Sequence, residues 1–171
     1  MIDKRTILDA RARRLAVVIG DASTAPSAVV LEVATFTLSG EQYAIETRYI
    51  REIIPLADFT PVPHSPSILF GVANLNGDVL AVFDLRPLLG LGLGSISDLC
   101  RVIVLGTERA EFGVLADAVH EVTTFPAATL FDLAGGTDQH RYVRGVTTDA
   151  LAVLDGQLML NDTRFSIDDG R

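Results

Sequence analysis

The feature that most constrains the fold of this chain is the dipeptide Asn76-Gly77, which stands between two apolar runs rich in β-forming residues. Both central residues of a type I′ turn need a positive φ angle, and Asn and Gly adopt it at the lowest cost. Residues 68–75 and 78–84 are therefore predicted to form a tight antiparallel hairpin.

Short runs with the two-residue period of β-strands recur from residue 29 onward, and no long helical pattern separates them. A parallel α/β sheet needs helices between its strands, so an all-β barrel or a pair of barrels is favoured. The further predicted elements are strands at 31–38, 42–46, 48–54, 100–106, 111–116, 118–124, 142–148 and 151–154, a helical turn at 87–90, and a short helix at 157–161.

The predicted connections are rich in proline and glycine. Residues 58–67 contain Pro61, Pro63 and Pro66, which predicts a rigid irregular connection or a sheet edge. A loop is predicted at 90–98. Its Gly90-Leu-Gly-Leu-Gly94 stretch lacks the Lys-Ser/Thr of a phosphate-binding loop and precedes no helix, which favours a flexible connection.

The first thirty residues are predicted to form a helical arm and a linker. Residues 5–16 are rich in helix-forming residues, and residues 20–28 have the composition of a flexible linker. Two interpretations stay open for the helix: a solvated segment, or a docking helix with a narrow apolar face.

Composition limits the environment and the partners of the chain. Its 171 residues, 49% of them hydrophobic, suit one domain or two small subdomains with a common core. Residues 1–31 hold five basic and three acidic residues, whereas residues 32–171 hold nine and nineteen. Such an acidic body disfavours binding to nucleic acid or anionic lipid. No apolar run reaches the roughly 18 residues needed to span a bilayer, and the start of the chain does not resemble a secretory signal, so a cytoplasmic protein is expected.

The residue types that usually carry catalysis or bind metals are scattered. His64, His120 and His140 do not have the spacing of metal ligands, and Cys100 lies in a strand-like run that predicts a buried apolar role. A reactive or metal-binding thiol is the alternative for Cys100. We expect no metal, no cofactor and no enzymatic activity.

Three aspartates, Asp84, Asp117 and Asp155, each follow a run of aliphatic residues. They could form a catalytic carboxylate set. Aspartate directly after a strand commonly caps the next turn by accepting backbone N–H bonds, and this interpretation is favoured.

Taken together, these segments resemble the CheW family of adaptors in bacterial chemosensory arrays. The similarity covers about residues 31–160, in an order and spacing that are more specific than any one piece. The segments that carry it are Phe36-Thr-Leu-Ser-Gly-Glu-Gln-Tyr-Ala-Ile45, Ile50-Arg-Glu-Ile53, Pro61-Val-Pro63, Pro66, Gly71-Val-Ala-Asn-Leu-Asn-Gly77, Val82-Phe-Asp-Leu-Arg86, Gly113-Val-Leu-Ala-Asp-Ala-Val-His-Glu-Val122 and Tyr142-Val-Arg-Gly-Val146.

The resemblance implies two intertwined five-stranded SH3-like β-barrels with short helices, spanning residues 31–168 after the arm and linker of 1–30, with a connection near 90–99. It also implies a non-catalytic scaffold that joins chemoreceptor cytoplasmic tips to the regulatory domain of a CheA-type histidine kinase. By the same resemblance, Ile50, Glu52, Gly71 and Asn76 are expected at the receptor-binding groove. Gly113 and Leu115 are expected where the kinase binds. Ordinary core packing is the alternative for Ile50 and Leu115, and a solvated charge is the alternative for Glu52.

Two positions depart from the family pattern. Asn76 stands where the family usually has arginine, and Ala81 where it usually has proline. Asparagine favours the turn but cannot reach a receptor carboxylate as a guanidinium can. The alternative function is therefore a standalone module that binds the kinase, and modulates or sequesters it, without the standard receptor coupling.

Overall fold

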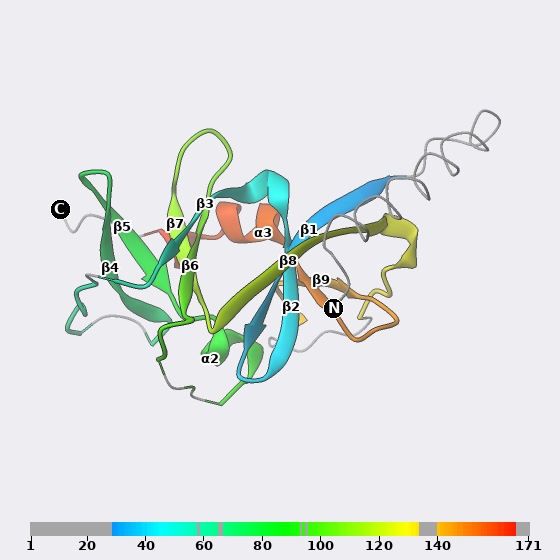
Figure 1. Ribbon diagram of the computed structural model, residues 1–171, viewed down its shortest axis with the longest axis horizontal. Coiled ribbons are helices and arrows are strands. Elements are labelled where there is room, and N and C mark those ends of the chain that lie inside the picture. The colour runs from blue at the N-terminus through cyan, green and yellow to red at the C-terminus, as the bar shows by residue number, and fades with distance from the viewer. Residues whose placement is uncertain are drawn as a thin grey trace.

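The computed structural model describes residues 29–57, 59–64, 67–92, 94, 96–133 and 140–166. The helical arm and linker predicted before residue 29 lie outside these residues. Within the described residues, ten strands form two five-stranded sheets that lie along the long axis of the molecule (Figure 1). The expectation of two five-stranded subdomains is confirmed.

The first sheet has the strand order β8-β1-β2-β10-β9, with β10 parallel to β2 and the other neighbours antiparallel. Its strands are β1 (Val30–Leu38), β2 (Glu41–Glu46), β8 (Ala118–Pro126), β9 (Val143–Val146) and β10 (Ala152–Leu154).

The second sheet has the order β3-β6-β7-β5-β4, and again one pair, β5 with β7, is parallel. Its strands are β3 (Ile50–Pro55), β4 (Leu69–Leu75), β5 (Asp78–Phe83), β6 (Arg101–Leu105) and β7 (Phe112–Ala116). The predicted type I′ hairpin joins β4 to β5, with φ angles of 52° at Asn76 and 93° at Gly77.

The chain passes between the two sheets at two crossings. The first is the 3-10 turn η2 (Thr47–Tyr49) between β2 and β3, and the second is Asp117 between β7 and β8. The predicted strand at 48–54 therefore begins two residues late, because the chain turns at η2. Residues 90–99, expected to connect the barrels, instead join α2 (Arg86–Leu89) to β6 on the second-sheet side, since β5 and β6 both belong to that sheet.

Each sheet is closed into a barrel by one backbone bridge. The segment after β3 returns to β4 through the pair Thr60–Val72, and the segment after β8 returns to β9 through Phe131–Val146. The proline-containing segment, which was expected to be an irregular connection or a sheet edge, thus contains the closing bridge of the second barrel.

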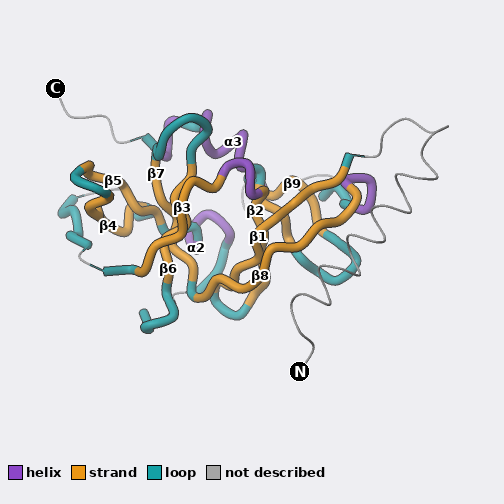
Figure 2. Tube along the Cα trace, turned by 45° about the horizontal axis from the view of Figure 1, so that its top comes forward, coloured by secondary structure: helices purple, strands orange, loops and turns teal. Residues whose placement is uncertain are grey.

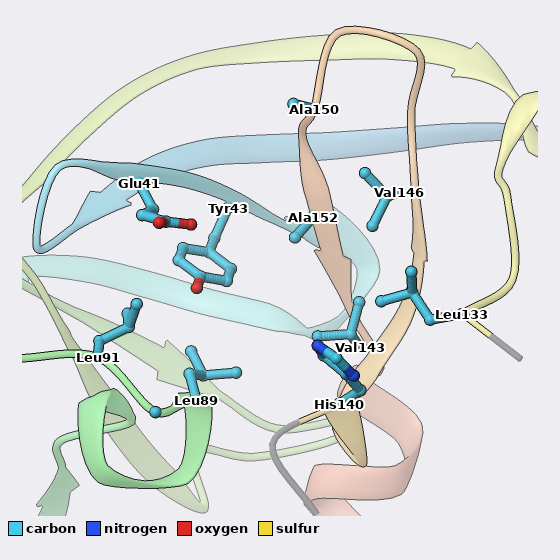
Figure 3. Close-up of a pocket in the computed structure, with 11 residues that line it drawn as sticks. Glu41, Tyr43, Leu89, Leu91, Leu133, His140, Val143, Val146, Ala150 and Ala152 are labelled. Atoms are coloured by element: carbon cyan, nitrogen blue, oxygen red, sulfur yellow. The ribbon is translucent and has the colours of Figure 1, made fainter. Parts of the chain in front are cut away.

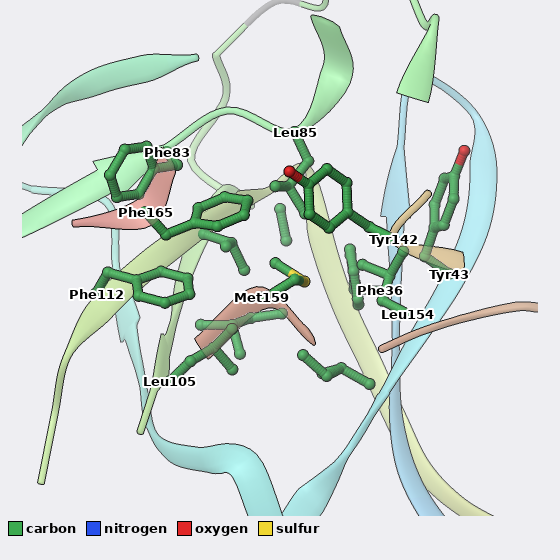
Figure 4. Close-up of a cluster of buried hydrophobic side chains, with 14 of the residues drawn as sticks. Phe36, Tyr43, Phe83, Leu85, Leu105, Phe112, Tyr142, Leu154, Met159 and Phe165 are labelled. Atoms are coloured by element: carbon green, nitrogen blue, oxygen red, sulfur yellow. The ribbon is translucent and has the colours of Figure 1, made fainter. Parts of the chain in front are cut away.

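The two barrels share a common apolar core, and each has a smaller interior of its own. In the common core, Phe165 stacks on Phe112 with ring centroids 4.9 Å apart and meets Phe83 edge to face at 5.2 Å (Figure 4). Side chains of both sheets line this core, and burial of each large apolar one contributes about 1.5–3 kcal/mol.

A structural repeat underlies this arrangement. The hairpin β4–β5 is followed by α2, and the hairpin β9–β10 is followed by α3 (Gly156–Asn161). Asp84 and Asp155 occupy the same place in the two units: Asp84 accepts the N–H of Arg86 at 3.0 Å and Asp155 accepts that of Leu158 at 3.0 Å. The capping interpretation is confirmed for both.

Three short 3-10 turns, η2, η3 (Ala127–Thr129) and η5 (Thr163–Phe165), complete the described elements.

Candidate protein-binding surfaces

Strand β3 is an edge of the second sheet, and Figures 1 and 2 place it near the middle of the molecule. Ile50 is half-buried and packs against the common core. A β-bulge between Ile50 and Glu52 turns consecutive side chains outward, so Arg51, Glu52 and Ile53 are all exposed. Of the residues proposed from the sequence, Glu52 is thus the one on this strand best placed to touch a partner.

Gly71 and Asn76 belong to the opposite edge of the same sheet. Asn76 is exposed at the tip of the β4–β5 hairpin, where the side chain of its neighbour Asn74 accepts the N–H of Gly77 at 2.9 Å. Gly71 is buried in β4, and a β-carbon there would lie 2.7 Å from the carbonyl oxygen of Thr60. Gly71 is therefore needed for closure of the barrel. In the strand order, three strands lie between β4 and the β3 residues Ile50 and Glu52, but the barrel closes on the other side, where the segment after β3 meets β4 at the Thr60–Val72 bridge.

Gly113 and Leu115 lie in β7, whose five residues are all buried. Leu115 is fully enclosed in the interior of the second barrel with Val82 and Val102. A β-carbon at Gly113 would come 2.4 Å from a methyl group of Val102. Neither residue can present a side chain to a partner, so their place in the fold is explained by packing rather than by direct contact with a kinase.

Asp117 does not form a catalytic set with Asp84 and Asp155 but takes part in a structural network. Its carboxylate accepts the N–H of Ser39 at 2.8 Å and forms an ion pair with Arg86. Arg86 also pairs with Asp84 at 3.1 Å. This role of Arg86 was not predicted from the sequence, although an arginine two residues after an aspartate and inside an apolar segment was a signal for a buried ion pair.

The role of Glu46, a buried carboxylate at the end of β2, was also not predicted. It pairs with Arg48 of η2 and Arg144 of β9, while the guanidinium of Arg48 lies 4.7 Å from the ring centroid of Tyr49. Glu46 therefore connects η2, where the chain first crosses between the sheets, to β9 of the first barrel. Burial raises the pKa of Tyr49.

The remaining candidate residues are separate from one another. Cys100 is buried, as expected for a packing role, and its sulfur accepts the N–H of Ser97 at 3.3 Å. His120 is hydrogen-bonded to the hydroxyl of Thr37, and His64 is exposed with a φ of 59°. Across the described ranges, no group of three or more His, Cys, Asp or Glu side chains gathers as a metal site would require. None of the described helices is long and apolar enough to cross a bilayer.

A pocket of about 350 Å³ lies between the end of α2 and the first sheet (Figure 3). Its walls are mainly aliphatic, including Leu89, Leu91 and Val143, with the Glu41 carboxylate and the Tyr43 phenol at one side. Burial, with a smaller effect of Glu41, raises the pKa of Tyr43. None of the six residues proposed to bind the receptor or the kinase lines this pocket, whereas His140, one of the three scattered histidines, does.

Large apolar side chains are exposed on the second barrel as well. Ile96 and Leu99, in the segment before β6, are 55% and 65% exposed, and Val79 in β5 is 76% exposed. The 96–99 segment is tied to the end of β3 through Cys100, whose carbonyl accepts the N–H of Leu56 at 3.3 Å. Neighbouring exposed apolar residues are typical of protein-binding surfaces.

Two closed five-stranded barrels, interleaved along the chain and packed on one core, define a class of double-barrel β proteins. Within that class the chain belongs to the CheW-like domain family, whose model matches residues 32–164.

Several characterised relatives and one solved structure are similar to the chain. A probable chemotaxis protein CheW of Rhizobium etli is 32% identical over 93 residues, which is 54% of this chain and 60% of that protein. The chemotaxis protein CheW of Thermotoga maritima is 30% identical over 75% of this chain and 82% of its own length. Protein FrzA of Myxococcus xanthus is 29% identical over 63% of this chain and 67% of that protein. The chain thus spans about three fifths to four fifths of these relatives. The crystal structure of the scaffolding protein TtCheW from Thermoanaerobacter tengcongensis shares the fold, with a TM-score of 0.69, 23% identity, and coverage of 87% of this chain and 94% of that one.

Proposed function

We propose that this protein is a non-catalytic adaptor that joins chemoreceptor cytoplasmic tips to a CheA-type histidine kinase. The observation that carries the proposal is the family match over residues 32–164, which includes nearly every strand of both barrels. A rigid body with two separate binding surfaces can hold two partners at once, so that one partner influences the state of the other. The place of action is the cytoplasm, where receptor tips and kinase meet.

The receptor-binding surface is proposed to include the exposed part of β3. Glu52 is exposed there beside Ile53, so a receptor helix could bury the isoleucine and pair a basic residue with the carboxylate. Asn76 is a second proposed contact, on the hairpin tip. An exposed ion pair adds about 1 kcal/mol or less, so the contribution of Glu52 is expected to be modest.

The kinase-binding surface is proposed to be the exposed apolar segment with Ile96 and Leu99. Because Gly113 and Leu115 are buried, a contact on this barrel must use side chains that reach its outside. Leu99 is 65% exposed and would lose that contact with water on binding.

The experiment measures binding of the purified protein to the kinase regulatory domain and, separately, to a receptor-tip fragment. Binding to both is expected. Glu52→Lys should weaken receptor binding about five- to tenfold, whereas Asp149→Lys, an exposed charge reversal on the first barrel, should leave it unchanged.

For the kinase, Leu99→Asp should weaken binding at least about tenfold, since it buries a carboxylate in an apolar interface. Val79→Asp is the matched control, since Val79 is an exposed valine in β5, outside the 96–99 segment. Binding to the kinase alone would favour the standalone module over the adaptor, and binding to neither partner would overturn both.

A further inference from the structure

We infer that Arg86 is a positioning residue that sets the orientation of the two barrels relative to each other. It is the first residue of α2 and is only 4% exposed. Its two terminal nitrogens point in different directions: Nη1 donates to Asp84 of its own barrel at 3.1 Å, and Nη2 donates to Asp117. Asp117 is the residue at which the chain leaves the second sheet for the first.

The network continues into the first barrel. The Asp117 carboxylate accepts the N–H of Ser39 in the β1–β2 turn, and the Asp117 N–H donates to the carbonyl of Thr37 at 2.9 Å. The Ser39 hydroxyl donates to the carbonyl of Gly92 at 2.7 Å, which returns the network to the segment after α2. Figure 1 shows α2 beside the turn between β1 and β2. Arg86 is therefore the charged centre of a closed set of contacts across the barrel junction.

The structural repeat shows that this set is not a general requirement of the fold. Arg86 lies two residues after Asp84, and Gln157 lies two residues after the equivalent Asp155. Gln157 meets the other crossing, where the Tyr49 hydroxyl donates to its Oε1 at 3.4 Å. The equivalent positions thus contact both crossings, but the Gln157 contact is a long neutral hydrogen bond, whereas Arg86 forms ion pairs with Asp84 and Asp117. The ion pairs of Glu46 at the first crossing join η2 only to strands of the first barrel.

This difference decides which contact orients the barrels. Apolar burial in the common core favours association but has little directionality. A guanidinium bound by two carboxylates tolerates few geometries, because its donors lie in a rigid plane. Without Arg86, the carboxylates of Asp84 and Asp117, whose side chains are 14% and 25% exposed, would face each other across the junction. Their repulsion would favour a different or more variable angle between the barrels.

For the adaptor of the preceding section, on which this consequence rests, the angle between the barrels determines how a bound kinase lies relative to a bound receptor. Loss of Arg86 should therefore preserve each separate binding step while reducing receptor control of the kinase.

The test measures a distance that changes with the angle between the barrels, in the protein alone, and so does not depend on the proposed partners. In a Cys100→Ala background, spin labels at Val79→Cys and Asp149→Cys report the distance between exposed sites on the two barrels. The variant with Arg86 intact should give one narrow distance distribution. In Arg86→Met, this distance distribution should shift or become about twofold broader. In Arg86→Lys, the change should be intermediate, because a compact ammonium group cannot donate to both carboxylates with the planar geometry of a guanidinium.

Val102→Ala is the control for loss of stability alone, since Val102 lies inside the second barrel and away from the junction. The distance distribution of the Val102→Ala variant should match that of the labelled protein with Arg86 intact. If Arg86→Met does not fold, Asp117→Asn replaces it, because the amide retains the shape but removes the charge. A folded Arg86 or Asp117 variant with an unchanged distribution would overturn the inference, whatever the binding experiments show.

Discussion

The α-carbon of Gly71 faces the backbone of Thr60 so closely that a β-carbon would lie 2.7 Å from the Thr60 carbonyl oxygen. The contact sits beside the bridge Thr60–Val72, whose two hydrogen bonds of 2.7 and 2.9 Å close the second barrel. Gly145 holds the equivalent place in the first barrel, where a β-carbon would lie 3.0 Å from the carbonyl oxygen of Phe131. In both barrels, therefore, a glycine next to the closing bridge allows the closing segment to approach the strand closely.

Gly71→Ala should lower the free energy of unfolding by about 1–3 kcal/mol, because the closing segment must move away from the added methyl group. Urea unfolding measures the loss. Gly92→Ala is the control, since no atom lies within 4 Å of a β-carbon there. Equal stability of the two variants would show that the closing segment moves freely.

Leu115→Ala should lower the stability by about 2–5 kcal/mol, because Leu115 is fully buried among aliphatic side chains. Its affinity for the kinase regulatory domain should be unchanged under conditions in which the variant is folded, as checked by circular dichroism. A tenfold loss of affinity in the folded variant would instead support Leu115 as part of the binding surface.

Asp162→Asn should weaken the dependence of the free energy of unfolding on pH in the acid range. The Asp162 carboxylate accepts hydrogen bonds from the Tyr142 hydroxyl at 2.6 Å and the Arg164 N–H at 2.9 Å. Burial alone would raise the pKa of Asp162, but these bonds and the nearby arginines bring it below its ordinary value. A carboxyl with a lowered folded-state pKa contributes stability above its unfolded pKa of about 3.9, and this contribution is lost as the pH falls through the folded value.

The measurement for Asp162 is urea unfolding at a series of pH values from about 6 down to 2. The asparagine variant should be less stable than the wild type at neutral pH and should lose less stability on acidification. Asp149→Asn, at an exposed turn, should keep the wild-type pH dependence. An Asp162→Asn curve parallel to that of the wild type would contradict the assignment.

Asn76→Arg should tighten binding to a receptor tip that carries an acidic residue at the contact, because it restores a guanidinium on the exposed hairpin tip. Arginine at a φ of 52° strains the turn, so the variant should also be less stable by about 1 kcal/mol. Titration with the receptor fragment measures the affinity. An intact fold with unchanged affinity would show that position 76 does not face the receptor.

Most strands were predictable because their signals are local. The Asn76-Gly77 turn adopts positive φ angles, and the alternation in residues 31–38 became β1, since a two-residue period is set within one strand. The positions of Gly71, Gly113 and Leu115 were recognised as family features. Core packing was the stated alternative for Leu115, but the burial of the two glycines was not predicted. Whether a glycine contacts a partner or a neighbouring backbone depends on which segment returns to it.

The sequence by itself determined the β class, the hairpin, and the caps at Asp84 and Asp155, because these depend on residues within a few positions of each other. Only the tertiary structure decided that Arg86 meets Asp117, thirty-one residues further along the chain. It also decided where the chain crosses between the sheets and which edges the closing bridges cover. Such pairings are fixed by the packing of both sheets on one core, and no local pattern of residues records them.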